Sequence, residues 1–140
     1  MRIARHTVYA ICVMVYLAGQ PLDGRTSTGT ISEVENIPRA FLSKVISKLV
    51  VARLVITSRG MGGGVSLARL PEEITLLQVI EAMEGPVLLY RCLLRRGTCE
   101  LHSYHAACDV WRDIQARLVQ DLDAVTMREL SSRHTEKKGI

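Results

Sequence analysis

Apolar residues in the first half of the chain recur every three to four positions, which is the spacing of amphipathic helices. This pattern predicts a helix over residues 7–17 and a short helix over residues 30–35, which opens with the capping-box sequence Thr30-Ile31-Ser32-Glu33. A third helix is predicted over residues 39–52, directly after the turn Asn36-Ile37-Pro38. Its buried stripe should consist of Phe41, Leu42, Val45, Ile46 and Leu49. Two short helices joined by a tight turn predict a helix-turn-helix.

A run of glycines with β-branched residues on both sides follows the third helix. Residues 55–59 and 65–69 predict two short strands, and Gly60-Met61-Gly62-Gly63-Gly64 between them predicts a hairpin loop. A glycine-rich loop could instead cradle a nucleotide phosphate, but no Lys-Ser or Lys-Thr pair follows this one and no helix opens there. A helix-turn-helix followed directly by a hairpin predicts a winged helix.

Two more helices are predicted in the second half. Residues 75–84 begin with the capping-box sequence Thr75-Leu76-Leu77-Gln78, and Gly85-Pro86 ends this helix. One long helix is predicted over residues 106–130, with an apolar stripe of Trp111, Ile114, Leu118, Leu122 and Val125. A long helix with such a narrow stripe usually packs on a partner helix, and packing on its own domain is the alternative.

The predicted fold class is therefore mainly α with a small β-hairpin wing, ending in a long C-terminal dimerisation helix. Residues 1–86 form the winged helix-turn-helix, and residues 87–108 form a cysteine-containing segment. Residues 106–130 form the dimerisation helix, and the polar residues 131–140 are expected to form a flexible tail.

Charge differs between the two halves. Residues 1–70 carry a net charge of +6 and residues 71–140 a net charge of −2, which together give +4 for the chain. A basic half suggests contact with a polyanion, and a mildly acidic half suggests contact with protein.

Two classes of protein are disfavoured by the sequence. No apolar run reaches the roughly 18 residues that span a bilayer, and Tyr9 and Tyr16 argue against a signal peptide at the start of the chain. We therefore expect a cytoplasmic protein without membrane contact. No nucleophile–base pair or catalytic carboxylate pair is apparent, so an enzyme is not expected.

Four cysteines are present, and three of them lie close together in the second half. Cys12 falls within an apolar run and is expected to be a small core residue. Cys92, Cys99 and Cys108 fall within seventeen residues. Clustered cysteines in a protein that is not expected to hold structural disulfides indicate metal or redox chemistry.

Several segments, in this order along the chain, are similar to a known family. They are residues 37–44 (IPRAFLSK), 58–67 (SRGMGGGVSL), 71–76 (PEEITL) and 79–86 (VIEAMEGP), preceded by Tyr9-Ala10. Over essentially its whole length the chain resembles the Rrf-two family of bacterial winged-helix regulators. This family includes the iron–sulfur cluster regulator, the nitric-oxide-sensing repressor and the rhizobial iron regulator.

The resemblance implies a set of DNA-contacting residues in the third helix and the wing. Side chains near the start of a recognition helix reach base edges in the major groove, and Arg is suited to bidentate contact with guanine. A wing Arg would enter the adjacent minor groove. The implied residues are Arg39, Ala40, Phe41, Ser43 and Lys44 in the helix, after Pro38, with Arg59 and Gly60 in the wing. Many members carry an acidic residue where Ser43 stands, so no operator sequence is predicted.

Cluster-binding members of the family carry three evenly spaced cysteines that end in a Cys-x2-His-x2-Trp pattern. Anchored on Trp111, this chain places Cys99 on the second cysteine and Cys92 on the first, with one inserted residue. His105 occupies the third cysteine position and Cys108 the usual histidine position, so the two residue types are exchanged. The resemblance thus implies an iron–sulfur cluster, 2Fe-2S or 4Fe-4S, held by Cys92, Cys99, Cys108 and His105.

Two other interpretations stay open for these residues. Three cysteines and one histidine could hold zinc, and the cysteines could also be thiol sensors that are oxidised without a metal. His102, three residues from Cys99, is an additional candidate ligand.

The predicted function is that of a DNA-binding transcriptional regulator, a repressor that binds a double-stranded DNA operator as a homodimer. Its operator affinity would be controlled by the iron–sulfur cluster in response to oxygen, nitric oxide or iron status. A clusterless thiol- or zinc-dependent redox regulator of the same fold is the alternative.

Overall fold

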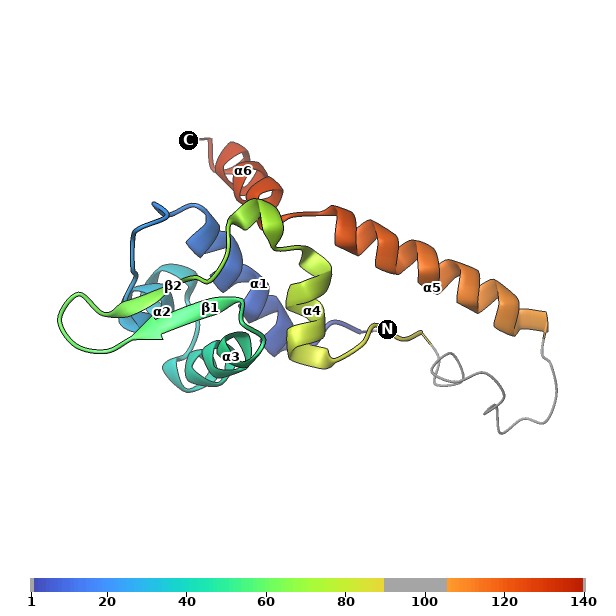
Figure 1. Ribbon diagram of the computed structural model, residues 1–140, viewed down its shortest axis with the longest axis horizontal. Coiled ribbons are helices and arrows are strands. Elements are labelled where there is room, and N and C mark those ends of the chain that lie inside the picture. Colours follow the sequence, from blue (N-terminus) through green and yellow to red (C-terminus); the bar gives the residue numbers. More distant parts are fainter. Residues whose placement is uncertain (1, 90–105, 140) are drawn as a thin grey trace.

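The computed structural model describes residues 2–89 and 106–139. Its helices and strands form a winged-helix domain from which one long helix projects as an arm (Figure 1). The elements in chain order are α1 (Arg5–Ala18), α2 (Thr28–Glu35), α3 (Arg39–Val51), β1 (Val55–Ser58), β2 (Gly64–Leu67), the 3-10 helix η1 (Pro71–Glu73), α4 (Leu76–Glu84), α5 (Ala106–Ala124) and α6 (Met127–Lys137).

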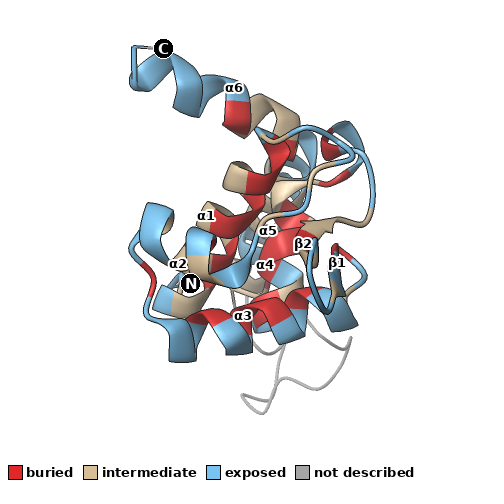
Figure 2. Cartoon of the chain, turned by 90° about the vertical axis from the view of Figure 1, so that its left-hand side faces the viewer, coloured by how far each residue is buried: buried red, intermediate tan, exposed pale blue. Residues whose placement is uncertain are grey.

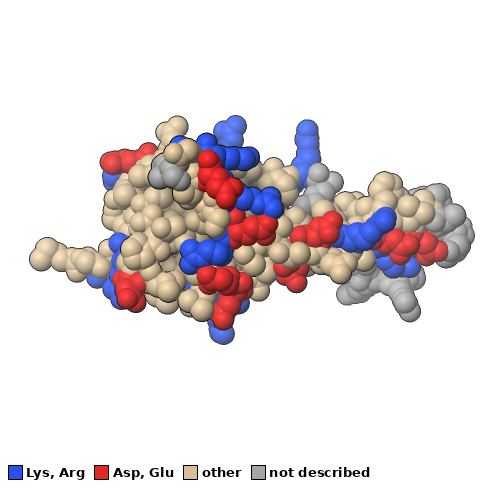
Figure 3. All heavy atoms as spheres, turned by 90° about the horizontal axis from the view of Figure 1, so that it is seen from above, with Lys and Arg blue, Asp and Glu red and all other residues tan. Residues whose placement is uncertain are grey.

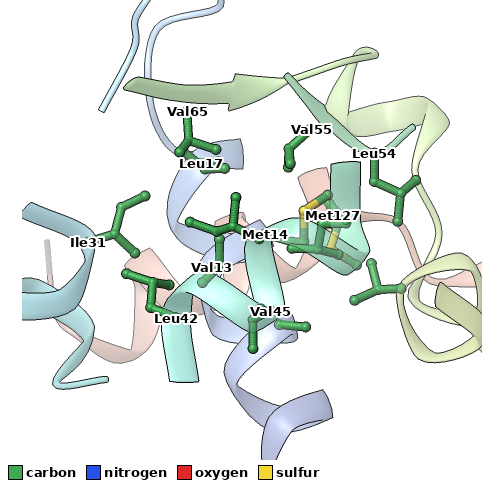
Figure 4. Close-up of a cluster of buried hydrophobic side chains, with 14 of the residues drawn as sticks. Val13, Met14, Leu17, Ile31, Leu42, Val45, Leu54, Val55, Val65 and Met127 are labelled. Atoms are coloured by element: carbon green, nitrogen blue, oxygen red, sulfur yellow. The ribbon is translucent and has the colours of Figure 1, made fainter. Parts of the chain in front are cut away.

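Helix α1 lies at the centre of the domain and contacts α2, α3, α4, α6 and β2. Its buried side chains include Val13 and Met14, both without exposed surface. Figure 4 shows how the apolar side chains from the surrounding elements converge on this helix, and Figure 2 shows buried residues concentrated along it. Burial of this many aliphatic side chains is the main stabilising contribution to such a domain.

The helix-turn-helix formed by α2 and α3 begins earlier than predicted. The cap of α2 is Ser27, whose side-chain oxygen accepts from the N–H of Thr30 at 3.1 Å, so the predicted start at Thr30 is wrong. The chain is already turned at this point because Thr26 pairs with Val65 of β2. At the other end, Asn36 adopts a left-handed conformation with a φ of 53° and leads into the turn.

Helix α3 buries four of the five residues predicted for its apolar stripe: Leu42, Val45, Ile46 and Leu49. The fifth, Phe41, is 49% exposed, and its assignment to the core is therefore wrong. Its ring instead lies at the edge of the stripe, with its centroid 6.1 Å from that of Tyr9 on α1.

The wing is an antiparallel hairpin whose strands are shorter than the predicted residues 55–59 and 65–69. Val55 pairs with Leu67, and Ser58 pairs with Gly64 at the far end. The loop before α2 adds a third short pairing, because Thr26 and Val65 exchange N–H···O bonds of 3.0 and 2.8 Å. A Cβ on Gly64 would lie 2.6 Å from the carbonyl oxygen of Thr26, so this close pairing requires glycine.

Helix α4 has the predicted capping box. The side chain of Thr75 accepts from the N–H of Gln78, and the side chain of Gln78 accepts from the N–H of Thr75. Gly85 ends the helix with a φ of 78°, as its position in the sequence predicted.

The C-terminal part differs from the predicted single helix over residues 106–130. Helix α5 ends at Ala124, and a second helix, α6, begins at Met127 with Thr126 as its cap. The break occurs because Thr126 pairs with Thr75, and the N–H groups of Leu76 and Met127 donate to Val125 and Ile74. Residues 131–137, predicted to belong to a flexible tail, are helical and continue α6.

The fully buried Met127 and the buried Ser131 join α6 to the domain, where it packs on α1 and η1. Among residues 2–89 and 106–139, no helix is long and apolar enough to cross a bilayer.

Candidate nucleic-acid interface and sensor segment

The outer face of α3 presents every residue that was predicted to contact DNA from this helix. Arg39, Ala40, Phe41, Ser43 and Lys44 are all exposed. The buried side chains of α3 anchor the opposite face in the core, which fixes the orientation of the helix. An exposed helix face of this composition offers hydrogen-bond donors, a hydroxyl and an aromatic ring to a partner.

Arg39, in the first turn of α3, lies over the start of α2. A Cβ on Gly29 would lie 3.3 Å from Nη2 of Arg39, so the absence of a side chain at this position leaves room for the guanidinium. The arrangement therefore joins Arg39 to both helices of the helix-turn-helix.

A small hollow of about 200 Å³ lies beside the recognition helix. The Lys48 ammonium donates to the main-chain oxygen of Met83 at 3.3 Å, which ties α3 to the end of α4. The hollow is lined by His6, Phe41, Lys44, Val45, Lys48 and Met83.

The wing brings two further predicted residues, Arg59 and Gly60, to its exposed far end. The end of β1, next to the wing loop, is held by Arg25, whose Nη1 donates to Oγ of Ser58 at 2.9 Å. Arg25 was not among the predicted site residues, because its place in a polar loop carries no signal that distinguishes it from other surface residues. Its contact couples the loop before α2 to the wing.

Charge is mixed on the α6 side of the molecule. Figure 3 shows basic and acidic side chains interspersed on this face and along the arm formed by α5. Such a surface has no large region of one sign, in contrast to the sequence of residues 1–70, which is basic. The face in Figure 3 is therefore a poor candidate for binding a polyanion.

Of the residues predicted to hold a cluster, the structure describes Cys108 alone. Cys108 lies in the first turn of α5 as a half-buried free thiol. Cys92, Cys99 and His105, together with the additional candidate His102, lie outside the described residues. The structure therefore places one candidate ligand and leaves the assembly of the set a prediction.

Cys12, which was predicted to be a core residue, is partly buried and packs against the core from α1. Burial raises the pKa of its thiol, and the carboxylate of Glu35 raises that pKa further. A thiol in this environment is a poor nucleophile and a poor metal ligand, because both roles require the thiolate.

Three contacts fix α5 relative to the winged-helix domain. Leu118, Val119 and Leu122 pack against a small apolar cluster formed by Leu77, Ile80 and Val87. Oε1 of Gln115 accepts from the N–H of Leu89 at 2.9 Å. Oδ1 of Asp123 accepts from Oγ1 of Thr75 at 3.0 Å. A displacement of α5 would therefore move its partners at the start of α4 and in the segment that follows α4.

Arg128 was missed by the sequence analysis, although it joins three elements. Its Nε donates to Oε1 of Glu72 at 2.7 Å, and its Nη1 donates to the main-chain oxygen of Ala18 at 3.2 Å. The signal that could have found it is Thr126-Met127-Arg128-Glu129, which has the capping-box form and marks the start of a helix. The N–H of Glu129 does donate to Oγ1 of Thr126, at 3.2 Å.

Comparison with known sequences gives one family. A family model described as Rrf2, iron-dependent transcriptional regulator, matches residues 3–133. The HTH-type transcriptional regulator IscR of Aliivibrio salmonicida is 32% identical over 130 residues, which cover 93% of this chain and 77% of the relative. The HTH-type transcriptional regulator NsrR of Halalkalibacterium halodurans is 28% identical over 141 residues, covering 100% of this chain and 97% of the relative.

Solved structures have the same architecture. CymR, the global cysteine regulator of B. subtilis, matches with a TM-score of 0.82 at 28% identity, over 95% of this chain and 98% of its own. The IscR of T. potens shares the fold, with a TM-score of 0.78 at 23% identity over 99% of this chain and 91% of its own.

Proposed function

The chain belongs to the Rrf2 family of transcriptional regulators, and from this premise we propose that it represses transcription as a homodimer under the control of an iron–sulfur cluster. It is a DNA-binding transcriptional regulator with a winged-helix fold, and its relatives are regulators rather than enzymes. The observation that carries the proposal is the exposed face of α3, with Arg39, Ser43 and Lys44 on it and Arg59 in the neighbouring wing.

Helix α3 enters the major groove and the wing lies along the adjacent minor groove. Arg39, at the start of α3, contacts a base edge there, with Ala40, Phe41 and Ser43 beside it. Lys44 contacts the phosphate backbone and contributes affinity that falls with salt. Arg59 enters the minor groove, where a narrow A·T-rich stretch attracts Arg, and the exposed Gly60 lets the backbone approach the duplex.

This part of the proposal is tested by binding to duplexes selected by the wild-type protein from a randomised library. Arg39→Ala should weaken binding by about 1–3 kcal/mol and relax the preference for one base position. Arg133→Ala on α6 removes the same charge from an exposed ion pair with Glu129, and it should leave the affinity unchanged. Equal losses in both variants would show that α3 does not read the sequence.

The proposed homodimer forms through α5. None of the described side chains of α5 is fully buried within the chain, and Val110 and Trp111 are 57% and 47% exposed. In Figure 1 the start of this helix projects away from the domain, so Val110 and Trp111 are available to a second copy, whereas Leu118 and Leu122 of the predicted stripe pack on the chain's own domain. Dimerisation would set the distance between two recognition helices, and half-sites one helical turn apart would match that distance.

The proposed cluster is held by Cys92, Cys99, Cys108 and His105. The iron-dependent character of the family supports it, and so does the similarity to IscR and NsrR. Cys108 offers a free thiol at the start of α5, and thiolate is the usual protein ligand of iron–sulfur clusters. When bound, such a cluster would react with oxygen or nitric oxide or be lost when iron is scarce.

Regulation then follows from the way in which α5 is attached. Because Cys108 is part of α5, binding or release of a ligand there shifts the balance between two positions of this helix. Asp123 transmits the position of α5 to Thr75, the cap of α4, and Gln115 transmits it to Leu89 in the segment that follows α4. A coupling of about 1–3 kcal/mol between the two sites changes operator affinity roughly 5- to 150-fold.

Anaerobic purification with visible absorption, iron and acid-labile sulfide assays tests the cluster. Wild type should be coloured and contain sulfide, and Cys92→Ala, Cys99→Ala and Cys108→Ala should each lose both. Cys12→Ala is the matched control, since Cys12 packs against the core, and this variant should keep the cluster.

A colourless wild type without sulfide, also after reconstitution, would contradict the cluster. The regulator would then be the thiol- or zinc-dependent alternative of the same fold. Zinc analysis and mass mapping of oxidised Cys92, Cys99 and Cys108 would separate these two.

A further inference from the structure

The apex of the wing carries the most exposed large apolar side chain in the described part of the chain. Met61 has a relative exposure of 106%, and the next values are 84% for Val51 and 62% for Leu22. In Figure 3 the hairpin protrudes from the domain, and its end carries neither basic nor acidic atoms. Among residues 2–89 and 106–139, no contact buries any part of this side chain, so its apolar surface is free for a partner.

The apex is a closed turn. The N–H of Gly63 donates to the carbonyl oxygen of Gly60 at 2.9 Å, so Met61 and Gly62 are its two central residues. Gly62 has a φ of 79°, the value that the second central residue of a type II turn requires. Gly63 approaches the strand so closely that a Cβ there would lie 2.6 Å from the carbonyl oxygen of Ser58. The turn therefore holds the backbone of Met61 at the outermost point of the wing.

The wing is joined to the helix-turn-helix next to its loop. Arg25 bonds to Ser58, the last residue of β1, and Thr26 pairs with Val65, the second residue of β2, so the loop that leads into α2 holds both strands at the end from which the wing loop projects. These contacts and the closed turn give the backbone of Met61 a defined position relative to α3. When α3 lies in the major groove, the apex is the part of the wing that can reach furthest into the adjacent groove.

We propose that Met61 is an apolar wedge that inserts at a base step of the minor groove and kinks the operator there. Proteins that bind this groove often insert Met or another apolar side chain between base steps. Met is unbranched and adaptable, and Arg59 beside it is attracted to the potential of a narrow groove. The inference rests on the proposed function, because it requires the wing to lie on DNA.

A wedge adds specificity at a position where no base edge is read. The cost of a kink depends on the sequence that is deformed, and it is low for pyrimidine–purine steps and high for stiff A-tracts. Operators of this protein should therefore carry a TA or CA/TG step opposite the wing.

The test uses a duplex selected by the wild-type protein from a randomised library, and a copy whose step opposite the wing is replaced by an A-tract. Anisotropy gives the affinity, and energy transfer between the two duplex ends gives the bend. Wild type and Met61→Leu should bend the selected duplex and prefer it. Met61→Ala should bind it roughly tenfold more weakly, bend it less and lose the preference between the two duplexes.

The outcomes separate the wedge from the proposed function. If Met61→Ala bends and discriminates like the wild type, or if Met61→Leu behaves like Met61→Ala, the wedge is overturned. Arg39→Ala in the same assays would then still lose affinity if the proposed DNA contact is right. A wild-type protein that selects no duplex overturns both, and the exposed Met61 would then be sought on a protein or membrane surface.

Discussion

The winged-helix domain and the helix α5 differ in how completely each buries its own apolar residues. In the domain, α1 alone buries six residues, and side chains such as Leu49 and Ile74 have no exposed surface. Helix α5 is 19 residues long, yet its stripe remains half-exposed, and Trp111 is 47% exposed. The domain therefore buries its own apolar residues, whereas the start of α5 leaves Val110 and Trp111 exposed, as the proposed dimer interface requires.

This difference separates two kinds of stability. Substitutions in the domain should change the free energy of unfolding of each chain. Substitutions on the outer face of α5 should change association and leave the domain folded. All measurements should therefore be made at one protomer concentration, because the proposed dimerisation would also contribute to the apparent stability.

The largest effect is expected from truncation of the core. Leu49→Ala removes a side chain with 0% exposure from the inner face of α3 and should lower the free energy of unfolding by about 2–5 kcal/mol. Urea unfolding followed by circular dichroism measures it. Val51→Ala, two residues along the same helix at 84% exposure, is the control and should stay within about 0.5 kcal/mol of wild type. Similar losses in both would show that the domain is not packed as described.

The next effect is on association through α5. Trp111→Ala should weaken the dimer by about 2 kcal/mol or more, roughly 30-fold, because exposed aromatic residues in an interface often dominate its energy. Sedimentation equilibrium measures the change, while circular dichroism should show an unchanged helix content. Arg117→Ala, on an exposed part of the same helix, should leave the dimer intact. A wild type that sediments as a monomer would contradict the proposed dimerisation surface.

A smaller effect is expected at the junction between α5 and α6. Thr126→Ala removes the oxygen that accepts from the N–H of Glu129, and the loss of such a cap costs about 0.5–2 kcal/mol. Thr126→Ser keeps the hydroxyl and should retain most of the stability. Urea unfolding and protection of the α6 amides from hydrogen exchange measure both variants. Equal stability and equal amide protection in Thr126→Ala and Thr126→Ser would show that the hydroxyl of Thr126 does not stabilise the junction.

The same junction shows how far the sequence could predict this fold. Local signals were sufficient where a helix and its cap are adjacent in sequence, as at Thr75 and Gly85. The capping-box form at Thr126 is as clear, but the continuous apolar spacing of the long predicted helix obscured it. The helix breaks between α5 and α6 because Thr126 pairs with Thr75, a residue far from it in the sequence.

A second pairing at a distance explains the misplaced start of α2. Ser27 and Thr30 are both suitable cap residues, and the sequence offers no preference between them. The pairing of Thr26 with Val65 turns the chain just before Ser27, and Ser27 therefore becomes the cap of α2. The sequence was also insufficient for Phe41 on α3. Helical spacing predicted a buried ring, but the contact with Tyr9 of α1, distant in sequence, shows that the ring lies at the edge of the apolar stripe. The family resemblance, by contrast, identified the residues on the outer face of α3 in advance.

The smallest effect concerns the ion pair that attaches α6 to η1. The hydrogen bond from Arg128 lowers the pKa of the Glu72 carboxyl below its usual value. A lowered folded-state pKa means that the pair contributes stability above the pKa of the unfolded chain, and that this contribution is lost as the pH falls through the folded-state pKa. Glu72→Gln should therefore be slightly less stable than wild type near neutral pH, and the difference should shrink as the pH falls through the lowered pKa of Glu72.

The control for this pair is Glu73→Gln, which removes the same charge from the neighbouring residue of η1. Urea unfolding of both variants at neutral and acidic pH measures the effect, which is small because both partners are exposed. If the loss of stability in Glu72→Gln relative to wild type became larger at acidic pH, the direction of the pKa shift of Glu72 would be contradicted. The test also sharpens the contrast between domain and arm. Arg128 holds α6 on the domain through Glu72 and Ala18. Loss of the ion pair should therefore lower the stability of the domain and leave association through α5 unchanged.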